Sequence, residues 1–183
     1  MGDKISASVL RPLSSTNDRL DVQDILPIFV QFLTALSAVL DKAMAHAQAN
    51  GIDPYVLVNM RLYPDMYTMA RQVQQATSHA SRVCAALAGV PVIDLSNTET
   101  TLPELKQRVA NVIALLKGLK PEQIDGTEDK VVKVGEREMP GQMMLLTRSL
   151  PQFYFHCTTA YDILRHAGVP LGKADFMGKP VSS

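Results

Sequence analysis

The sequence predicts an all-α protein that folds as an antiparallel four-helix bundle. Four long segments carry apolar residues at the three- and four-residue spacing of a helix face. The connections between these segments are short or moderate, and almost no stretch alternates polar and apolar residues as a strand does. No internal repeat or low-complexity tract competes with this interpretation.

The length of 183 residues fits a single domain, because two domains would each bury too small a core. Residues 1–20 mix polar residues, prolines and scattered charges without periodicity, which is typical of a flexible tail. We therefore expect a flexible N-terminal tail at 1–20, one four-helix domain at 21–178 and a short C-terminal tail at 179–183.

The first helix is predicted to begin at Asp24, where apolar residues start to recur at helical spacing, and to stop at Asn50-Gly51. Residues 52–64 are expected to form an irregular turn. Asp53-Pro54 and Tyr63-Pro64 lie in this stretch, and each disfavours helix at the residue before the proline.

The second helix is predicted from Asp65, as its N-cap, to Gly89. The third is predicted to begin at Thr101, where Thr-Leu-Pro-Glu forms a capping box, and to end near Gly118. The polar stretch 120–140 carries two short apolar runs around a turn, which predicts a small hairpin or ordered loop before the last helix.

The fourth helix is predicted from Gln142 to His166, with a stop at Gly168. Pro151 lies inside it and lacks a backbone donor, so the helix is expected to kink there or to restart at that residue. The residues from Leu171 onward are expected to drape over the surface.

The charges balance, with 18 basic and 18 acidic side chains, so no long-range field favours nucleic acid or an anionic membrane. The longest uninterrupted apolar runs are far shorter than a bilayer span, and the N-terminus lacks the apolar core of a signal peptide. We expect a soluble, cytoplasmic protein. Cys84 and Cys157 lie in helical patterns without a CxxC motif and are expected to be buried, reduced thiols.

Polar side chains recur on one face of the last helix, where Gln152, His156 and Thr159 stand three or four residues apart. Facing helices of a bundle can bring such groups together on one small organic ligand. The predicted catalytic residues are His156, Gln152 and Tyr161. The predicted ligand-binding residues are Gln72, His79, Arg61, Asp65 and Thr159.

Each of these residues also has a structural interpretation, because an inward His or Gln is more often a hydrogen-bonded core group than a catalyst. Arg61 precedes the second helix, where it either binds an anionic ligand or, as we expect, pairs with Asp65.

The four histidines form neither an HxxxH nor an HExxH motif, so no metal cofactor is expected. If a divalent metal is bound, His156 and His79 are its expected ligands. The sequence also lacks GxSxG, Walker-type and GxGxxG motifs, so hydrolase and nucleotide-binding functions lose support.

Two motifs resemble an uncharacterised branch of the DinB-like superfamily. One is RLxPDM, which begins at Arg61, and the other is LPxFYFHxTTAYxILRHxGVPLGK, which begins at Leu150. Together with the Thr-Glu-Thr-Thr-Leu-Pro-Glu-Leu run that opens the third helix, the resemblance covers residues 20–178.

The resemblance implies an up-down-down-up bundle with a central cleft at one end. In the wider superfamily this cleft commonly holds a divalent metal on three histidines, and some members are thiol-dependent transferases or isomerases. His156 occupies the place of the second His of the last-helix HxxxH, and Gln152 stands where the first would be. Gln72 or Gln74 lies near the place of the second-helix His.

Three functions stay open. The first is a metal-independent acid/base enzyme catalysing isomerisation, dehydration or cyclisation, with His156 as the proton-transfer group. The second is a non-catalytic module that binds a small molecule or a partner. The third is a thiol transferase that depends on a divalent metal. A homodimer is compatible with this fold class.

Overall fold

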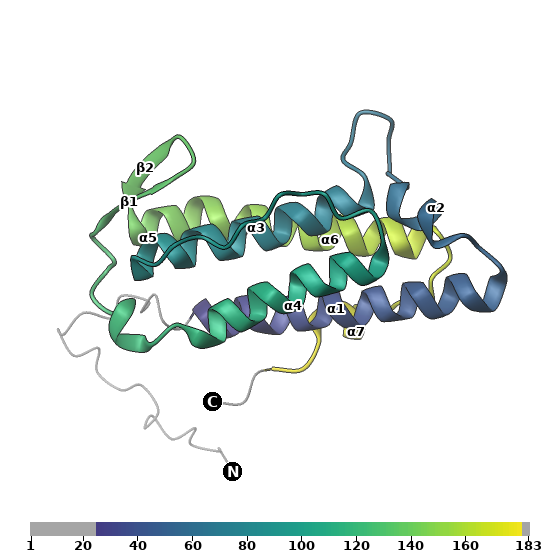
Figure 1. The fold of residues 1–183 in the computed structure, drawn as a ribbon, viewed down its shortest axis with the longest axis horizontal. Coiled ribbons are helices and arrows are strands. Elements are labelled where there is room, and N and C mark those ends of the chain that lie inside the picture. Colours follow the sequence, from purple (N-terminus) through teal and green to yellow (C-terminus); the bar gives the residue numbers. More distant parts are fainter. Residues whose placement is uncertain (1–24, 181–183) are drawn as a thin grey trace, which may run out of the picture.

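The computed structural model describes residues 25–180, and these form a bundle of four long helices (Figure 1). The predicted tail at 1–20 and residues 181–183 of the predicted C-terminal tail lie outside the described residues. The four helices are α1 (Ile25–Asn50), α3 (Met69–Ala88), α4 (Leu102–Gly118) and α6 (Leu150–His166).

The topology is up-down-down-up, as the family resemblance implies. In Figure 1, α1 and α6 run in one direction, and α3 and α4 run in the other. Antiparallel pairs form where α3 packs along α6 and where α1 packs along α4, while α3 and α4 are parallel neighbours. The crossover 89–101 therefore travels back along the length of the bundle to reach the start of α4.

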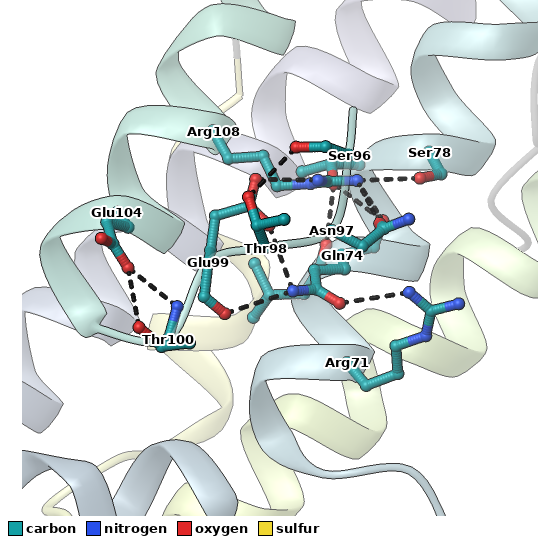
Figure 2. Close-up of polar contacts among 12 residues, drawn as sticks. Arg71, Gln74, Ser78, Ser96, Asn97, Thr98, Glu99, Thr100, Glu104 and Arg108 are labelled. Atoms are coloured by element: carbon teal, nitrogen blue, oxygen red, sulfur yellow. Dashed lines mark hydrogen bonds and ion pairs between the residues drawn. The ribbon is translucent and has the colours of Figure 1, made fainter. Parts of the chain in front are cut away.

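A buried arginine fastens this crossover. Arg108 of α4 is 2% exposed, and its Nη1 donates to Glu99 Oε1 at 2.9 Å, while its Nε donates to Thr77 Oγ1 of α3 at 2.6 Å. Its Nη2 also donates to Asn97 Oδ1 and Ser78 Oγ (Figure 2). A buried guanidinium is tolerated only where its charge and donors are matched, so this network fixes α3, α4 and the crossover relative to one another.

Two predictions for the segment before α3 are wrong, one about its secondary structure and one about the N-cap of α3. Residues 52–64 are not wholly irregular, because Pro54–Asn59 form the short helix α2, capped by Asp53, whose side chain accepts from the Tyr55 backbone N–H. The N-cap of α3 is Thr68 and not Asp65, since the Thr68 hydroxyl accepts from the Arg71 backbone N–H. Both Asp53 and Thr68 are ordinary capping residue types, so spacing alone did not separate them from their neighbours.

The predicted ends of the next elements are confirmed. Gly89 closes α3 in the left-handed conformation, with φ of +67°. Thr101 and Glu104 form a reciprocal capping box at the start of α4, which satisfies two backbone N–H groups that a helix leaves without partners.

The polar stretch after α4 contains the predicted hairpin. A short 3₁₀ turn, η2 (Pro121–Gln123), is followed by β1 (Val131–Val134) and β2 (Arg137–Pro140), which pair antiparallel with Val134 opposite Arg137. The hairpin rests on the end of α3. At its base, a Cβ on Gly141 would lie 2.5 Å from Leu87 Cδ2, so only glycine fits this approach.

The last helix is continuous but changes its winding before Pro151. It begins as α5 (Gly141–Met144), widens to a π-helical segment, η3 (Leu145–Ser149), and continues as α6. Leu150 N donates to the Leu145 carbonyl, five residues back. Since proline lacks an N–H and its ring crowds the carbonyl four residues earlier, the wider turn relieves the conflict without breaking the helix.

The C-terminal segment is packed rather than merely draped. Residues Lys173–Met177 form α7, which lies against α1. The Phe176 ring meets the Phe32 ring edge-on at 5.3 Å, and Lys42 pairs with Asp175 at 2.7 Å. This segment thus covers an apolar strip of α1 that a loose tail would leave exposed.

Helix α1 supplies much of the core. Ile25–Asn50 is long and apolar enough by composition to span a membrane. Half of its apolar 18-residue stretch is, however, buried inside the bundle. Its largest buried side chain, Phe29, meets Phe153 of α6 edge-on at 4.9 Å. Packing of this kind places one face of α1 in the core of the bundle.

Candidate functional site

Two histidines from facing helices stack on each other. His79 of α3 and His156 of α6 have ring centroids 5.5 Å apart and planes only 6° from parallel. The Tyr67 ring also lies near the His156 ring, with centroids 6.3 Å apart and planes 21° from parallel. His156 itself is 8% exposed. The sequence predicted both histidines, but not their direct contact.

The hydrogen bonds of Gln72 determine the tautomer of His156. Gln72 is 1% exposed, and its Nε2 donates to the Tyr67 carbonyl at 3.3 Å. Its Oε1 therefore faces His156 Nδ1, at 2.7 Å. An amide oxygen only accepts, so Nδ1 carries the proton and Nε2 keeps the lone pair of the neutral imidazole.

Both imidazoles are held neutral. Burial, with Arg82 and Arg148 nearby, lowers the pKa of His79 from 6.5 to about 4. Burial also lowers the pKa of His156 to about 4, with smaller contributions from His79 and Arg71. Burial and like charge each disfavour the imidazolium form, so both rings are proton acceptors at neutral pH.

A cavity of about 130 Å³ opens beside His79, at the hairpin end of the bundle. One wall is a single face of α3, formed by Gln75, Ser78, His79 and Arg82, which are spaced three and four residues apart. The opposite wall comes from the π-helical segment and the start of α6, and the hairpin closes the third side. The remaining lining residues are Val134, Gly135, Arg137, Met144, Arg148, Ser149 and Gln152.

His79, and not His156, reaches this cavity. His156 is absent from the lining, so it contacts the cavity only through the ring of His79. Of the two histidines, His79 is therefore the one that lines the cavity. The Arg108 network supports the same wall, because Ser78 both lines the cavity and accepts from Arg108 Nη2 at 2.9 Å.

Three arginines line the cavity, and none of them was predicted as a site residue. Arg82 comes from α3, Arg137 from β2 and Arg148 from the π-helical segment, so they are far apart in sequence. An arginine on an amphipathic helix usually marks a solvated face, so no sequence pattern singled out these three.

Two other predicted residues of α6 lie on the histidine side of the helix. Gln152 lines the cavity, and its Nε2 donates to the Arg148 carbonyl at 3.1 Å. Thr159 is buried, but its hydroxyl donates to the Phe155 carbonyl one turn earlier, at 2.8 Å. Gln152 can thus contact a ligand, whereas Thr159 satisfies its own helix.

Tyr161 lies away from the histidine pair, so its predicted catalytic role has no support from this arrangement. It contacts Phe176 of α7, at 5.9 Å between ring centroids, and faces a small apolar space shared with Phe32 and Cys157. Five residues separate it from His156, and five helical steps turn a side chain well past the face that His156 occupies.

Arg61 and Asp65 do not form the predicted ion pair. The Arg61 guanidinium donates to the Pro64 and Met66 carbonyls, at 3.1 and 3.3 Å, and so holds the turn before α3 together. Both side chains are exposed, and neither lines the cavity beside His79. Their predicted ligand-binding role has no support from this arrangement.

The cleft does not fit a divalent metal, the group that the superfamily resemblance implies. Ring nitrogen lone pairs lie in the ring plane, and the planes of His79 and His156 are nearly parallel, so their lone pairs do not converge on one point. His156 Nδ1 is engaged in its hydrogen bond with Gln72 Oε1. In addition, three guanidinium groups line the adjoining cavity and repel a cation. Within residues 25–180, no group of three His, Cys, Asp or Glu side chains is placed to hold a metal ion.

Comparison with known proteins gives the family. Residues 23–177 match the model of a family described as a domain of unknown function, DUF1993. The chain belongs to the DUF1993 family. A crystal structure described as a DinB family member from Shewanella denitrificans is 35% identical to this DUF1993 chain, with a TM-score of 0.78. The match covers 88% of this chain and 97% of that one, which confirms the DinB-like fold. No curated protein matches the chain.

The two cysteines of this DUF1993 chain are structural. Cys84 and Cys157 are buried, unpaired thiols, as predicted. Complete burial raises the pKa of both thiols far above the usual range, so neither supplies a thiolate nucleophile.

Proposed function

We propose that this protein is a small-molecule enzyme that uses the His79–His156 pair for metal-independent acid/base chemistry. The observation that carries the proposal is the ring stack. His79 lines a cavity, and directly behind it stands a second imidazole whose tautomer Gln72 holds fixed. Isomerisation, dehydration and cyclisation all require a proton to leave one atom and another to be delivered, which a positioned imidazole performs without a cofactor.

The cavity supplies groups that orient a substrate next to His79. The Ser149 hydroxyl and the Gln152 amide both line it, and each can bond a carbonyl or hydroxyl oxygen. His156 acts through His79 as a positioning residue, since it holds the plane of the other ring and does not itself line the cavity. We place this activity in the cytoplasm, in keeping with the two unpaired cysteines.

A non-catalytic binding module is the second candidate, and the low pKa of both histidines favours it. A general base works best when its pKa lies near the working pH, and both imidazoles have a pKa of about 4. The pair would then only bind a ligand, as two neutral hydrogen-bonding groups. The metal-dependent thiol transferase is the weakest alternative, because the arrangement of the rings does not suit a cation.

Deuterium exchange separates an enzyme from a binding module. Short oxo acids, hydroxy acids and sugar phosphates are first screened for thermal stabilisation of the full-length protein. Each compound that binds is then incubated with the protein in deuterated water, and loss of its carbon-bound proton signal is followed by NMR. An acid/base enzyme exchanges a proton next to a carbonyl even where the full reaction does not proceed.

The expected result is exchange by the native protein that falls by about a hundredfold or more in His79→Ala. His166→Ala is the matched control, because His166 is exposed at the far end of α6 and does not line the cavity. Ligands that bind without any exchange would identify a binding module. A chelator that lowers the melting temperature of untagged protein would instead revive the metal-dependent alternative.

A further inference from the structure

We propose that the cavity beside His79 binds the anionic group of the substrate, a carboxylate or phosphate, between Arg82, Arg137 and Arg148. This inference rests on the proposed function in one respect only, that the ligand is a substrate. It names the chemical class of that ligand from the charges around the cavity.

The three arginines reach one small space from three separate elements. Arg82 lies one turn after His79 on α3, Arg148 lies on the π-helical segment, and Arg137 lies on β2. No Asp or Glu lines the cavity with them. In the part of the chain that the structure describes, ion pairs are formed by Lys42, Lys106 and Arg108, and by none of these three arginines.

The contrast with Arg108 shows what a structural arginine looks like in this protein. Arg108 is buried, paired with Glu99 and bonded through all three of its nitrogens (Figure 2). The cavity arginines instead leave their donors for a ligand. Guanidinium groups bind carboxylate and phosphate oxygens through two parallel hydrogen bonds, which is the geometry for which arginine is favoured over lysine.

Uncharged donors complete the site. The Gln75 and Gln152 amides and the Ser149 hydroxyl line the same cavity, and each can donate to an oxyanion. A volume of about 130 Å³ accommodates a group with a few non-hydrogen atoms, so the cavity suits one oxyanion and a short chain.

An anion at this place would also prepare His79 for proton transfer. Burial is the largest cause of the low pKa of His79, and the charges of Arg82 and Arg148 lower it further. Arg137 lines the same cavity, and the neutral ring of His156 stacks against that of His79. A bound carboxylate or phosphate offsets the guanidinium charges and raises the pKa of His79 toward neutrality. Substrate binding would then reduce the mismatch between an acid/base role and a low pKa.

Anion titration of the full chain tests the site. Inorganic phosphate and malonate are titrated separately at low ionic strength, against chloride at equal ionic strength, while the histidine ring proton signals are followed by NMR. We expect saturable binding of phosphate, malonate or both, with selective shifts of the His79 and His156 signals. The tighter of the two ligands identifies the anionic group as phosphate or carboxylate.

Three variants locate the binding. Arg148→Gln and Arg82→Gln each remove one guanidinium and keep a polar side chain, and each should weaken binding by about tenfold or more. Arg165→Gln is the matched control, because Arg165 is exposed and lies at the C-terminal end of α6, away from the cavity. This variant should bind the anion as the native protein does. Arg82 is exposed, so its replacement leaves the fold intact even if that of the half-buried Arg148 does not.

Two outcomes would overturn the anion site: no preference over chloride for either probe, or equal affinities in Arg82→Gln, Arg148→Gln and Arg165→Gln. The proposed function fails separately. If folded His79→Ala binds the anion normally and the native protein exchanges no substrate proton, the anion site stands and the enzyme proposal does not. If exchange is undiminished in the arginine variants, the enzyme proposal stands and the anion site does not.

Discussion

Mild acid should destabilise this protein because of the buried histidine pair. The pKa of His156 is about 4 in the folded protein and about 6.5 as a free side chain. Between these values the unfolded chain binds a proton that the folded chain does not, so stability falls as the pH falls. The stability that His156 contributes is complete above about pH 6.5 and is lost progressively down to about pH 4.

The magnitude follows from the two pKa values. Lowering the pH from about 8 to about 5 should cost about 2 kcal/mol at His156 alone. His79 is less deeply buried but has its pKa lowered to a similar value, so it adds a further loss of the same sign. Urea denaturation followed by circular dichroism at several pH values measures the change in the free energy of unfolding.

Variants isolate this effect from that of the carboxylates, which titrate in every form of the protein. His156→Gln keeps a donor for the Gln72 amide oxygen but does not titrate, so its loss of stability between about pH 8 and about pH 5 should be about 2 kcal/mol smaller than that of the native protein. His166→Gln should retain the native loss. Equal losses in His156→Gln and the native protein would refute the burial and pairing of this histidine.

Three further substitutions test the fold around the site by thermal unfolding. Arg108→Met should lower the free energy of unfolding by about 3 kcal/mol or more, since it leaves Glu99 without its buried partner. Thr101→Ala should cost about 1 kcal/mol, because the capping box of α4 loses its hydroxyl. Gly141→Ala should cost about 1–3 kcal/mol, because its Cβ would overlap Leu87. An unchanged melting temperature in any of the three would contradict the contact concerned.

Sequence patterns predicted the long helices well where local chemistry determines the boundary. Asn50 ends α1, Gly89 closes α3, and the capping box beginning at Thr101 opens α4, as expected. Each of these boundaries depends on a side chain or a backbone conformation within a few residues. The start of α3 was predicted three residues early because Asp65 and Thr68 are both capable of capping, and only the chain path selects Thr68.

Features that depend on distant parts of the chain were not predictable. The packing of α7 on α1 requires Phe176 to meet Phe32, and no local pattern joins them. The π-helical segment reflects a local cause, Pro151, but a kink and a restart were equally consistent with it. The burial of Arg108 likewise depends on partners contributed by α3 and the crossover, which the local pattern of the third helix does not contain.

In the candidate site too, the features set by local spacing were predictable, and those that depend on distant residues were not. Helical spacing placed Gln152 and His156 on one face of the last helix, and the structure brings His156 together with Gln72 and His79. The cationic cavity was not predictable from local spacing, because its arginines come from three elements. The overall balance of 18 basic and 18 acidic side chains does not indicate it either. Net charge describes the whole chain, whereas binding responds to the charges within a few ångströms.

The three arginines around the cavity offer a physical reason why this DinB-like cleft has no metal ligand set among the described residues. A divalent cation and a cluster of guanidinium groups both stabilise an anionic substrate, since both place positive charge beside its oxygens. They exclude each other, because Arg82 and Arg148 next to His79 repel a cation and hold the imidazole neutral. Gln152 stands where the family resemblance implies a ligating histidine, and the three arginines beside His79 place positive charge around the cavity, as our proposal of an anion site requires.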